Sequence, residues 1–220
     1  MTASHDSRKL FLEGPAGRLE AILWTPFAPE RHRPPLAAVV CHPHPLFGGT
    51  MHNKVVYQAA KSLDALGLPV LRFNFRGAGL SAGEHDRGAG EQGDVRAALD
   101  FLAKQFPEVP LLQAGFSFGA WVGLHVGCEE PRVSHLIGLG TPVNSSDFSF
   151  LRKCRKPKLF VHGGNDQYGA LQCVKALVAS LPGENHLVAV EGVDHFFAGK
   201  LNELDAAITN WVREVFHLRH

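Results

Sequence analysis

A serine stands between two glycines in the run GFSFG at residues 115–119, after an apolar segment and before an amphipathic one. This G-x-S-x-G pattern is typical of a serine nucleophile on a sharp strand-to-helix turn, because glycines on either side leave room for the tight backbone. A serine hydroxyl is a poor nucleophile near neutral pH. It needs a histidine to take up its proton and a carboxylate to orient that histidine. Ser117 is therefore the first residue for which we predict a chemical role.

An aspartate and a histidine follow later in the chain, each just beyond an apolar run. Asp166 comes after KLFVHG (158–163), and His195 comes after HLVAVEG (186–192). Residues beyond the carboxyl ends of parallel strands meet at one edge of an α/β sheet. Asp194 is an alternative acid, but neighbours in sequence rarely face each other well. The sequence predicts a catalytic triad of Ser117, Asp166 and His195 for acyl transfer.

The triad requires a sheet that brings these residues together. Short apolar runs alternate with amphipathic segments, which predicts an α/β fold with a mostly parallel sheet flanked by helices. Strands are expected at about 9–13 and 18–24, paired as an antiparallel hairpin, and then at 36–40, 69–75, 110–115, 135–140, 158–163 and 186–192. Helices are expected at about 53–66, 91–106, 118–129, 170–181 and 202–217. The prediction is an eight-stranded sheet in a single domain spanning residues 1–220.

The composition limits the kinds of partner that the protein could bind. With 20% charged residues and a net charge of +1, the chain lacks the basic excess that nucleic acid or an anionic membrane would attract. The first ten residues lack the apolar run of a signal peptide, and no run is long enough to span a bilayer, so we expect a cytoplasmic protein. The four cysteines form no C-x-x-C pair and are expected to be reduced thiols.

Five motifs together resemble a known family: HPHPLFGG, RFNFRGAGLS, GFSFG, GGNDQ and VDHFF. They are similar to motifs of the α/β-hydrolase superfamily, and more closely to small bacterial predicted hydrolases with an HPHP loop, related to the dienelactone-hydrolase-like group. The resemblance covers nearly the whole chain and implies that Arg76 and Gly77 brace the loops around the site. Dienelactone hydrolases proper carry cysteine as the nucleophile, whereas this chain has Ser117, which implies turnover of esters.

The loop CHPHPLFGG (41–49) is predicted to hold the oxyanion of the tetrahedral intermediate. In this fold one donor is the N–H of the residue after the nucleophile, here Phe118, and a second comes from the loop after the third strand. The two prolines of the loop carry no N–H. Resemblance to the E-I-F-G loop of dienelactone hydrolases aligns Leu46 with the second donor, and His44 is the alternative.

The same loop offers a competing metal hypothesis. Cys41, His42 and His44 are all possible ligands, but a site needs three or four, and no further ligand stands at a recognisable spacing. We therefore predict no metal and no cofactor. His42 is expected to hold the loop in shape by hydrogen bonding.

These observations predict a serine carboxylesterase that cleaves small or short-acyl esters through an acyl-enzyme intermediate. Only roughly seventeen residues, 141–157, separate two predicted strands where many hydrolases of this fold insert a cap, so no large cap domain is expected. Phe47 and Phe148 are predicted to line the acyl pocket. The expected partner is a small-molecule ester or thioester, with no nucleic acid and no membrane. A thioesterase or amidase with the same triad, or a non-catalytic binding module, are the alternatives.

Overall fold

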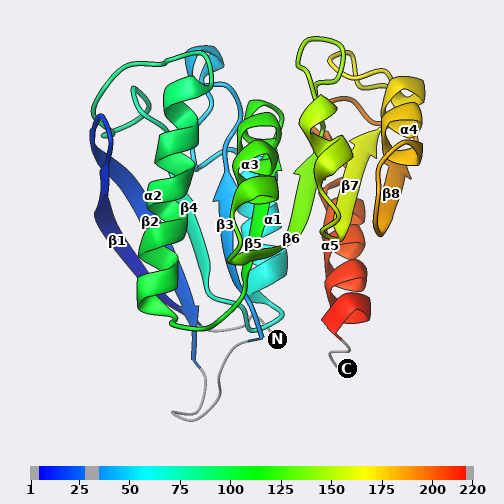
Figure 1. Ribbon diagram of the computed structural model, residues 1–220. Coiled ribbons are helices and arrows are strands. Elements are labelled where there is room, and N and C mark those ends of the chain that lie inside the picture. The colour runs from blue at the N-terminus through cyan, green and yellow to red at the C-terminus, as the bar shows by residue number, and fades with distance from the viewer. Residues whose placement is uncertain (1–4, 28–34, 217–220) are drawn as a thin grey trace.

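The computed structural model describes residues 5–27 and 35–216, within which one sheet of eight strands is flanked by α-helices (Figure 1). The strands are β1 (His5–Gly14), β2 (Gly17–Pro26), β3 (Ala37–Cys41), β4 (Val70–Phe73), β5 (Leu111–Phe116), β6 (Val133–Leu139), β7 (Lys158–Gly163) and β8 (Asn185–Val190). The helices are α1 (Lys54–Asp64), α2 (Ala89–Gln105), α3 (Phe118–Glu129), α4 (Leu171–Ala179) and α5 (Leu201–Phe216). Two short 3₁₀ helices, η1 (Pro45–Phe47) and η2 (Ser149–Lys153), lie in the loops.

The sheet order is β1-β2-β4-β3-β5-β6-β7-β8. β1 pairs antiparallel with β2, and β2 pairs antiparallel with β4, whereas all pairs from β4 to β8 are parallel. The predicted hairpin, mostly parallel sheet and five helices are thus confirmed. The hairpin strands extend beyond the predicted ranges because the ladder continues through polar residues, from Gly14 opposite Gly17 to His5 opposite Pro26. The Pro-rich link at 25–35 lies largely outside the described residues.

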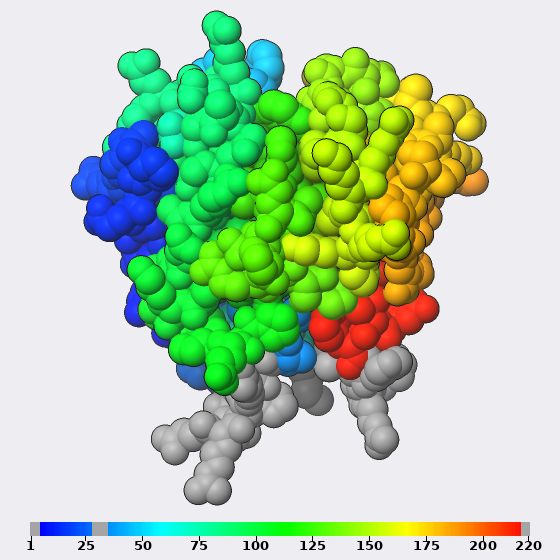
Figure 2. All heavy atoms as spheres, viewed as in Figure 1, coloured from blue at the N-terminus to red at the C-terminus, as the bar shows by residue number. Residues whose placement is uncertain are grey.

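Helices cover both faces of the sheet because its central strands are apolar on both sides. In β3, Ala38 and Val40 face the core beneath α1 and α5, whereas Ala37 and Val39 face the core beneath α2 and α3. Successive strand residues point to opposite faces, and this explains why the run lacks a polar alternation. Figure 2 shows α2 and α3 packed side by side over one face, with the segment after β6 beside them.

The carboxyl ends of β3, β5, β6, β7 and β8 lie at the same edge of the sheet, where the connecting loops gather (Figure 1). The connection from β6 to β7 holds only the short helix η2, so no large cap covers this edge within the described ranges. No helix of the described chain is long and apolar enough to cross a lipid bilayer.

Candidate active site

Ser117 occupies the sharp turn between β5 and α3. Its backbone has φ 56° and ψ −121°, a conformation that costs a non-glycine residue of order 1–3 kcal/mol. The flanking glycines are required for close packing: a Cβ on Gly115 would collide with the backbone of Gly119, and a Cβ on Gly119 would collide with the carbonyl oxygen of His42. The Ser117 N–H donates to the carbonyl of Leu139 at 2.9 Å, which fixes the turn against β6. The sequence pattern therefore presents the serine side chain at the sheet edge.

The serine, the histidine and the aspartate form a continuous hydrogen-bonded chain. His195 Nε2 lies 2.9 Å from Ser117 Oγ, and His195 Nδ1 lies 2.7 Å from Asp166 Oδ2. A carboxylate only accepts hydrogen bonds, so Nδ1 carries the proton and Nε2 is free to accept from the serine hydroxyl. The imidazole and the carboxylate are both buried, and Phe116 and Tyr168 contact the imidazole ring at centroid distances of 4.9 and 4.6 Å. This geometry is that of a base oriented toward a nucleophile.

The Asp166 carboxylate is held by its own loop and by a histidine that the sequence reasoning missed. Its Oδ1 accepts the N–H groups of Tyr168 at 2.8 Å and Gly169 at 3.1 Å. His162, at the end of β7, donates from Nε2 to the Gly169 carbonyl at 2.6 Å. Burial lowers the pKa of His162, although its hydrogen bond and the nearby carboxylate oppose that shift. A neutral His162 therefore fixes the loop that orients Asp166. In the sequence, its place at the end of the same predicted strand, four residues before Asp166, could have indicated this role.

Asp194, the alternative acid, forms hydrogen bonds within its own turn. Its carboxylate accepts the N–H groups of Phe196 and Ala198 at 3.0 and 3.2 Å, which stabilises the turn after β8. The side chain in contact with the imidazole of His195 is Asp166.

His42 anchors the loop at 41–49 to the end of β4. Its Nε2 accepts the Phe75 N–H at 2.9 Å, so its Nδ1 carries the proton and donates to the Pro43 carbonyl at 2.6 Å. Burial lowers the pKa of His42 to about 4, which keeps the ring neutral. The predicted hydrogen-bonding role is confirmed. Among the described residues, no group of three or more His, Cys, Asp or Glu side chains is placed to hold a metal ion.

The two candidates for the second oxyanion donor differ in position. The Leu46 N–H donates to the Nδ1 of His44 at 3.3 Å, and the Leu46 side chain is 70% exposed, outside the cavity beside Ser117. His44 lines that cavity, and its N–H has no hydrogen-bond partner within the described part of the chain. Phe118 also lines the cavity, and as the first residue of α3 its N–H has no partner inside the helix.

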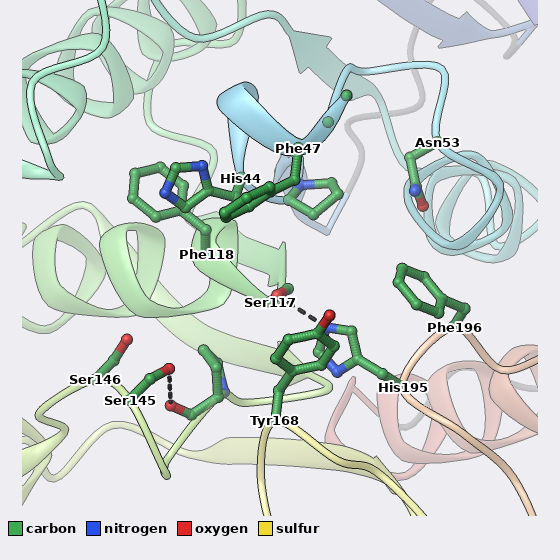
Figure 3. A pocket seen from close by; sticks show the side chains of 14 residues that line it. His44, Phe47, Asn53, Ser117, Phe118, Ser145, Ser146, Tyr168, His195 and Phe196 are labelled. Carbon is green, nitrogen blue, oxygen red and sulfur yellow. Dashed lines mark hydrogen bonds between the residues drawn. The ribbon is translucent and has the colours of Figure 1, made fainter.

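The cavity beside Ser117 has a volume of about 370 Å³ and is mainly apolar. Figure 3 shows the rings of Phe47 and Phe118 on one side of Ser117, and Tyr168 and His195 on the other. Phe47 lies at the rim with 86% of its surface exposed. The lining also includes polar residues that the sequence did not indicate, since each comes from a loop or a helix start: Asn53, Ser145, Ser146 and Tyr168.

The prediction that Phe148 lines this cavity is wrong. Its side chain is buried in the core on the α2 and α3 face and packs against Phe150, at a ring centroid distance of 5.8 Å. From the loop after β6, Ser145 and Ser146 line the cavity. The phenylalanine rings instead pack into the core beneath η2.

Arg76 braces the loop after β4, as the motif resemblance implied. Its Nη2 lies 2.7 Å from Asp94 Oδ1, and its Nε and backbone N–H both lie 3.0 Å from Asp94 Oδ2. This hydrogen-bonded pairing raises the pKa of Arg76 and ties the loop to α2. Charge-assisted, bidentate pairs of this kind are geometrically specific.

A strained serine at the edge of a mostly parallel sheet, in contact with an oriented histidine and without a large cap, defines an α/β serine hydrolase. Residues 34–156, more than half of the chain, match the family described as serine aminopeptidase, S33, and the chain belongs to this family of α/β hydrolases.

Similar proteins share this architecture over nearly their whole length. A crystal structure of an α/β serine hydrolase without a lid, from Xanthomonas campestris, is 38% identical, with a TM-score of 0.87 over 96% of this chain and 95% of that chain. An α/β serine hydrolase homologue from Coxiella burnetii is 37% identical, with a TM-score of 0.85 over 93% of this chain and 97% of that chain. An uncharacterised protein of Rickettsia prowazekii is 39% identical over 93% of this chain and 88% of its own length.

Proposed function

We propose that this protein is a serine carboxylesterase that cleaves small, uncharged, short-acyl esters through an acyl-enzyme intermediate. The observation that carries the proposal is the unbroken hydrogen-bonded chain from Asp166 through His195 to Ser117, at the base of an apolar cavity. A non-catalytic binding module would gain nothing from a strained serine whose hydroxyl faces a neutral nitrogen.

The proposed reaction begins when Ser117 Oγ attacks the ester carbonyl and His195 Nε2 takes the hydroxyl proton. Asp166 stabilises the imidazolium through the Nδ1–H bond and keeps the ring in its tautomer. His195 Nε2 then gives the proton that it took from Ser117 to the leaving alcohol. Water then enters, loses a proton to His195 Nε2 and attacks the acyl carbonyl. The bond from the acyl carbon to Ser117 Oγ breaks, Oγ takes the proton back from Nε2, and the acid is released. Every step uses groups of this chain and water.

The oxyanion is proposed to lie between the backbone N–H groups of Phe118 and His44. His44 is preferred over Leu46 because the Leu46 N–H is already bonded within its own loop. His42 supports this arrangement by joining Pro43 to Phe75, so that the loop stays rigid as charge develops. Removal of one preorganised donor of this type lowers kcat by a factor of about 10²–10³.

The cavity supports the choice of substrate class. Its lining, within the described chain, has no Asp, Glu, Lys or Arg, so no fixed charge is available to pair with a charged acyl group. Its volume of about 370 Å³ and its apolar walls suit a short acyl chain beside Phe47 and Phe196. The uncovered edge leaves space for a larger alcohol group to extend into solvent.

A fluorophosphonate probe tests the mechanism directly, because it labels only an activated serine. Wild type should be labelled at Ser117, and Ser117→Ala should not be labelled. Ser146→Ala is the matched control: this serine lines the same cavity but makes no contact with His195, so its removal should preserve labelling. Undiminished labelling of Ser117→Ala, or no labelling of wild type, overturns the proposal.

Substrate class is tested with p-nitrophenyl acetate, butyrate and octanoate beside a matched acyl-thioester series. We expect kcat/KM to be highest for the shorter esters. In Asp166→Asn it should fall by on the order of 10⁴-fold, because the Asn oxygen would accept the N–H groups of Tyr168 and Gly169 and its NH₂ would donate to His195 Nδ1, which favours the wrong tautomer. A consistent preference for thioesters would reassign the protein to the thioesterase alternative, with the same residues.

A further inference from the structure

Two cysteine thiols meet at the end of α3 that lies away from Ser117. Cys128 stands in the last turn of α3, and Cys154 follows η2 just before β7. The two side chains line the same cavity, and each thiol shifts the pKa of the other. At 1.5 Å of rise per residue, Cys128 lies about 16 Å along the helix from Ser117, so this pair is separate from the candidate active site.

Two lysines are fixed beside the thiols by backbone carbonyls. Lys156 Nζ donates to the carbonyls of Gly127 and Glu130 at 2.7 and 2.6 Å. Lys158 Nζ donates to the carbonyls of Cys154 and Lys156 at 2.6 and 2.7 Å. The Lys156 bonds hold its ammonium group at the C-terminal end of α3, where the helix dipole favours cations, whereas the Lys158 bonds hold its ammonium group against the segment that leads into β7.

Lys158 is fully buried, and no carboxylate of a described residue lies within ion-pair distance of it. A buried cation without an anion is costly, so a compensating negative charge nearby is favourable. The thiols are the neighbouring groups that can supply that charge. The adjacent Cys128 thiol, together with the two lysines, lowers the pKa of Cys154, whereas the adjacent Cys154 thiol and burial raise the pKa of Cys128. One sulfur is therefore favoured as a thiolate and the other as a protonated donor.

Small molecules can reach the pair only through a cavity, because Cys154 is buried and Cys128 is half-buried. A cavity of about 470 Å³ is lined by both cysteines, by Trp121 and Phe150, and by the exposed side chains of Glu129 and Lys153. It lies between α3 and the segment that contains η2, which pack beside each other on the same face of the sheet (Figure 1). The cavity beside Ser117 shares none of these residues.

We propose that Cys154 and Cys128 form a peroxide-sensitive pair that a hydroperoxide converts reversibly to a disulfide. The Cys154 thiolate attacks the terminal oxygen of the hydroperoxide and the O–O bond breaks. The products are a Cys154 sulfenic acid and an alkoxide, or hydroxide from hydrogen peroxide, which takes a proton from solvent to become an alcohol or water. The Cys128 sulfur then attacks the Cys154 sulfur, and the sulfenic oxygen leaves as water with the Cys128 proton. Two thiols lose two electrons in total, and the peroxide gains them.

The bond would join the end of α3 to the residues that lead into β7. Because α3 begins directly after Ser117 and β7 leads to Asp166, the link would connect the two elements that carry the nucleophile and the acid. A dithiol reductant would restore the open form.

The experiment treats the reduced full-length protein with hydrogen peroxide at pH 7, blocks remaining thiols with N-ethylmaleimide, and maps the peptides by mass spectrometry. Cys173 is the internal control, because it is an exposed thiol on another helix, α4. We expect a linked Cys128–Cys154 peptide that dithiothreitol reverses, with Cys154 reacting roughly tenfold or more faster than Cys173. The link should form at a rate independent of protein concentration, as an intramolecular bond requires.

Variants separate the two roles. In Cys128→Ser, the Cys154 sulfenic acid should accumulate and react with dimedone, whereas Cys154→Ser should lose the fast reaction entirely. Cys173→Ser should behave as wild type. Oxidation of Cys173 at an equal or greater rate, with Cys128 and Cys154 still reduced in the wild-type protein, overturns the proposal whether or not the variants fold.

Discussion

Acidification should destabilise the protein through His42, whose imidazole must stay uncharged in the fold. Its Nε2 accepts the Phe75 N–H, so a proton placed there breaks that bond and charges a fully buried ring. Burial lowers the pKa of His42 to about 4, against an ordinary value of 6.5. Between these values the unfolded chain binds more protons than the folded one, so stability falls as the pH falls.

The magnitude follows from the difference between the two pKa values. Each unit corresponds to about 1.36 kcal/mol, so complete protonation removes about 3 kcal/mol of stability. Because the loss begins at the unfolded-state value and is complete only below the folded-state value, about 2 kcal/mol is already lost at pH 5. The contribution is fully present above pH 6.5.

Urea unfolding followed by tryptophan fluorescence, from pH 7.5 to pH 5, measures this effect in wild type and in His42→Gln. The glutamine oxygen can accept the Phe75 N–H but does not titrate in this range. Burial also lowers the pKa of His162 and His135, but their slopes are common to both proteins and cancel in the difference. We expect the variant to be less stable at pH 7.5 and the gap to narrow by about 2 kcal/mol at pH 5. If the free energy of unfolding changed equally with pH in wild type and in His42→Gln, the reasoning would be refuted. His52→Gln, at an exposed histidine, is the control and should follow wild type.

Three further changes test other parts of the structure. Asp94→Asn leaves the Arg76 guanidinium without its anion and should lower the free energy of unfolding by about 3–5 kcal/mol, whereas Asp100→Asn, at an exposed ion pair, should cost less than about 1 kcal/mol. Phe148→Ala should lower the free energy of unfolding by about 3–5 kcal/mol and leave the KM for short esters unchanged. Phe47→Ala should raise KM with little change in stability. If steady-state kinetics showed a raised KM for Phe148→Ala and none for Phe47→Ala, Phe148 would line the cavity after all. EDTA should leave esterase activity intact, because both ring nitrogens of the first histidine in the HPHP loop are hydrogen-bonded, and a loss restored by zinc would contradict that assignment.

The sheet and its helices were predictable because their signals are local. The central strands are short apolar runs, and the helix at residues 201–216 has its apolar residues on one face. Ser117 and Asp166 could be located because each follows such a run, and strand ends converge in this type of sheet. His195 follows the last strand and completes the same edge.

The remaining parts of the site depend on packing that no short segment encodes. His162 acts on Asp166 through the carbonyl of Gly169, an arrangement that exists only once the loop has folded. Alignment of a motif predicts Leu46 as the donor. The choice between Leu46 and His44 depends on which backbone N–H is already hydrogen-bonded within the 3₁₀ turn. The prediction for Phe148 is wrong because an aromatic residue near a site can face either the core or the cavity. Which of the two it faces depends on the conformation of its loop.

The uncovered sheet edge has a kinetic consequence. Where a cap must open and close, its motion often limits turnover. Here the short connection between β6 and β7 leaves the cavity beside Ser117 without such a gate in the described chain, so exchange of substrate and product should proceed by diffusion. An acyl group on the serine would then be open to any small alcohol as well as to water. The proposed esterase should therefore divide its acyl-enzyme between hydrolysis and transfer to an acceptor alcohol, in a ratio set by the acceptor concentration.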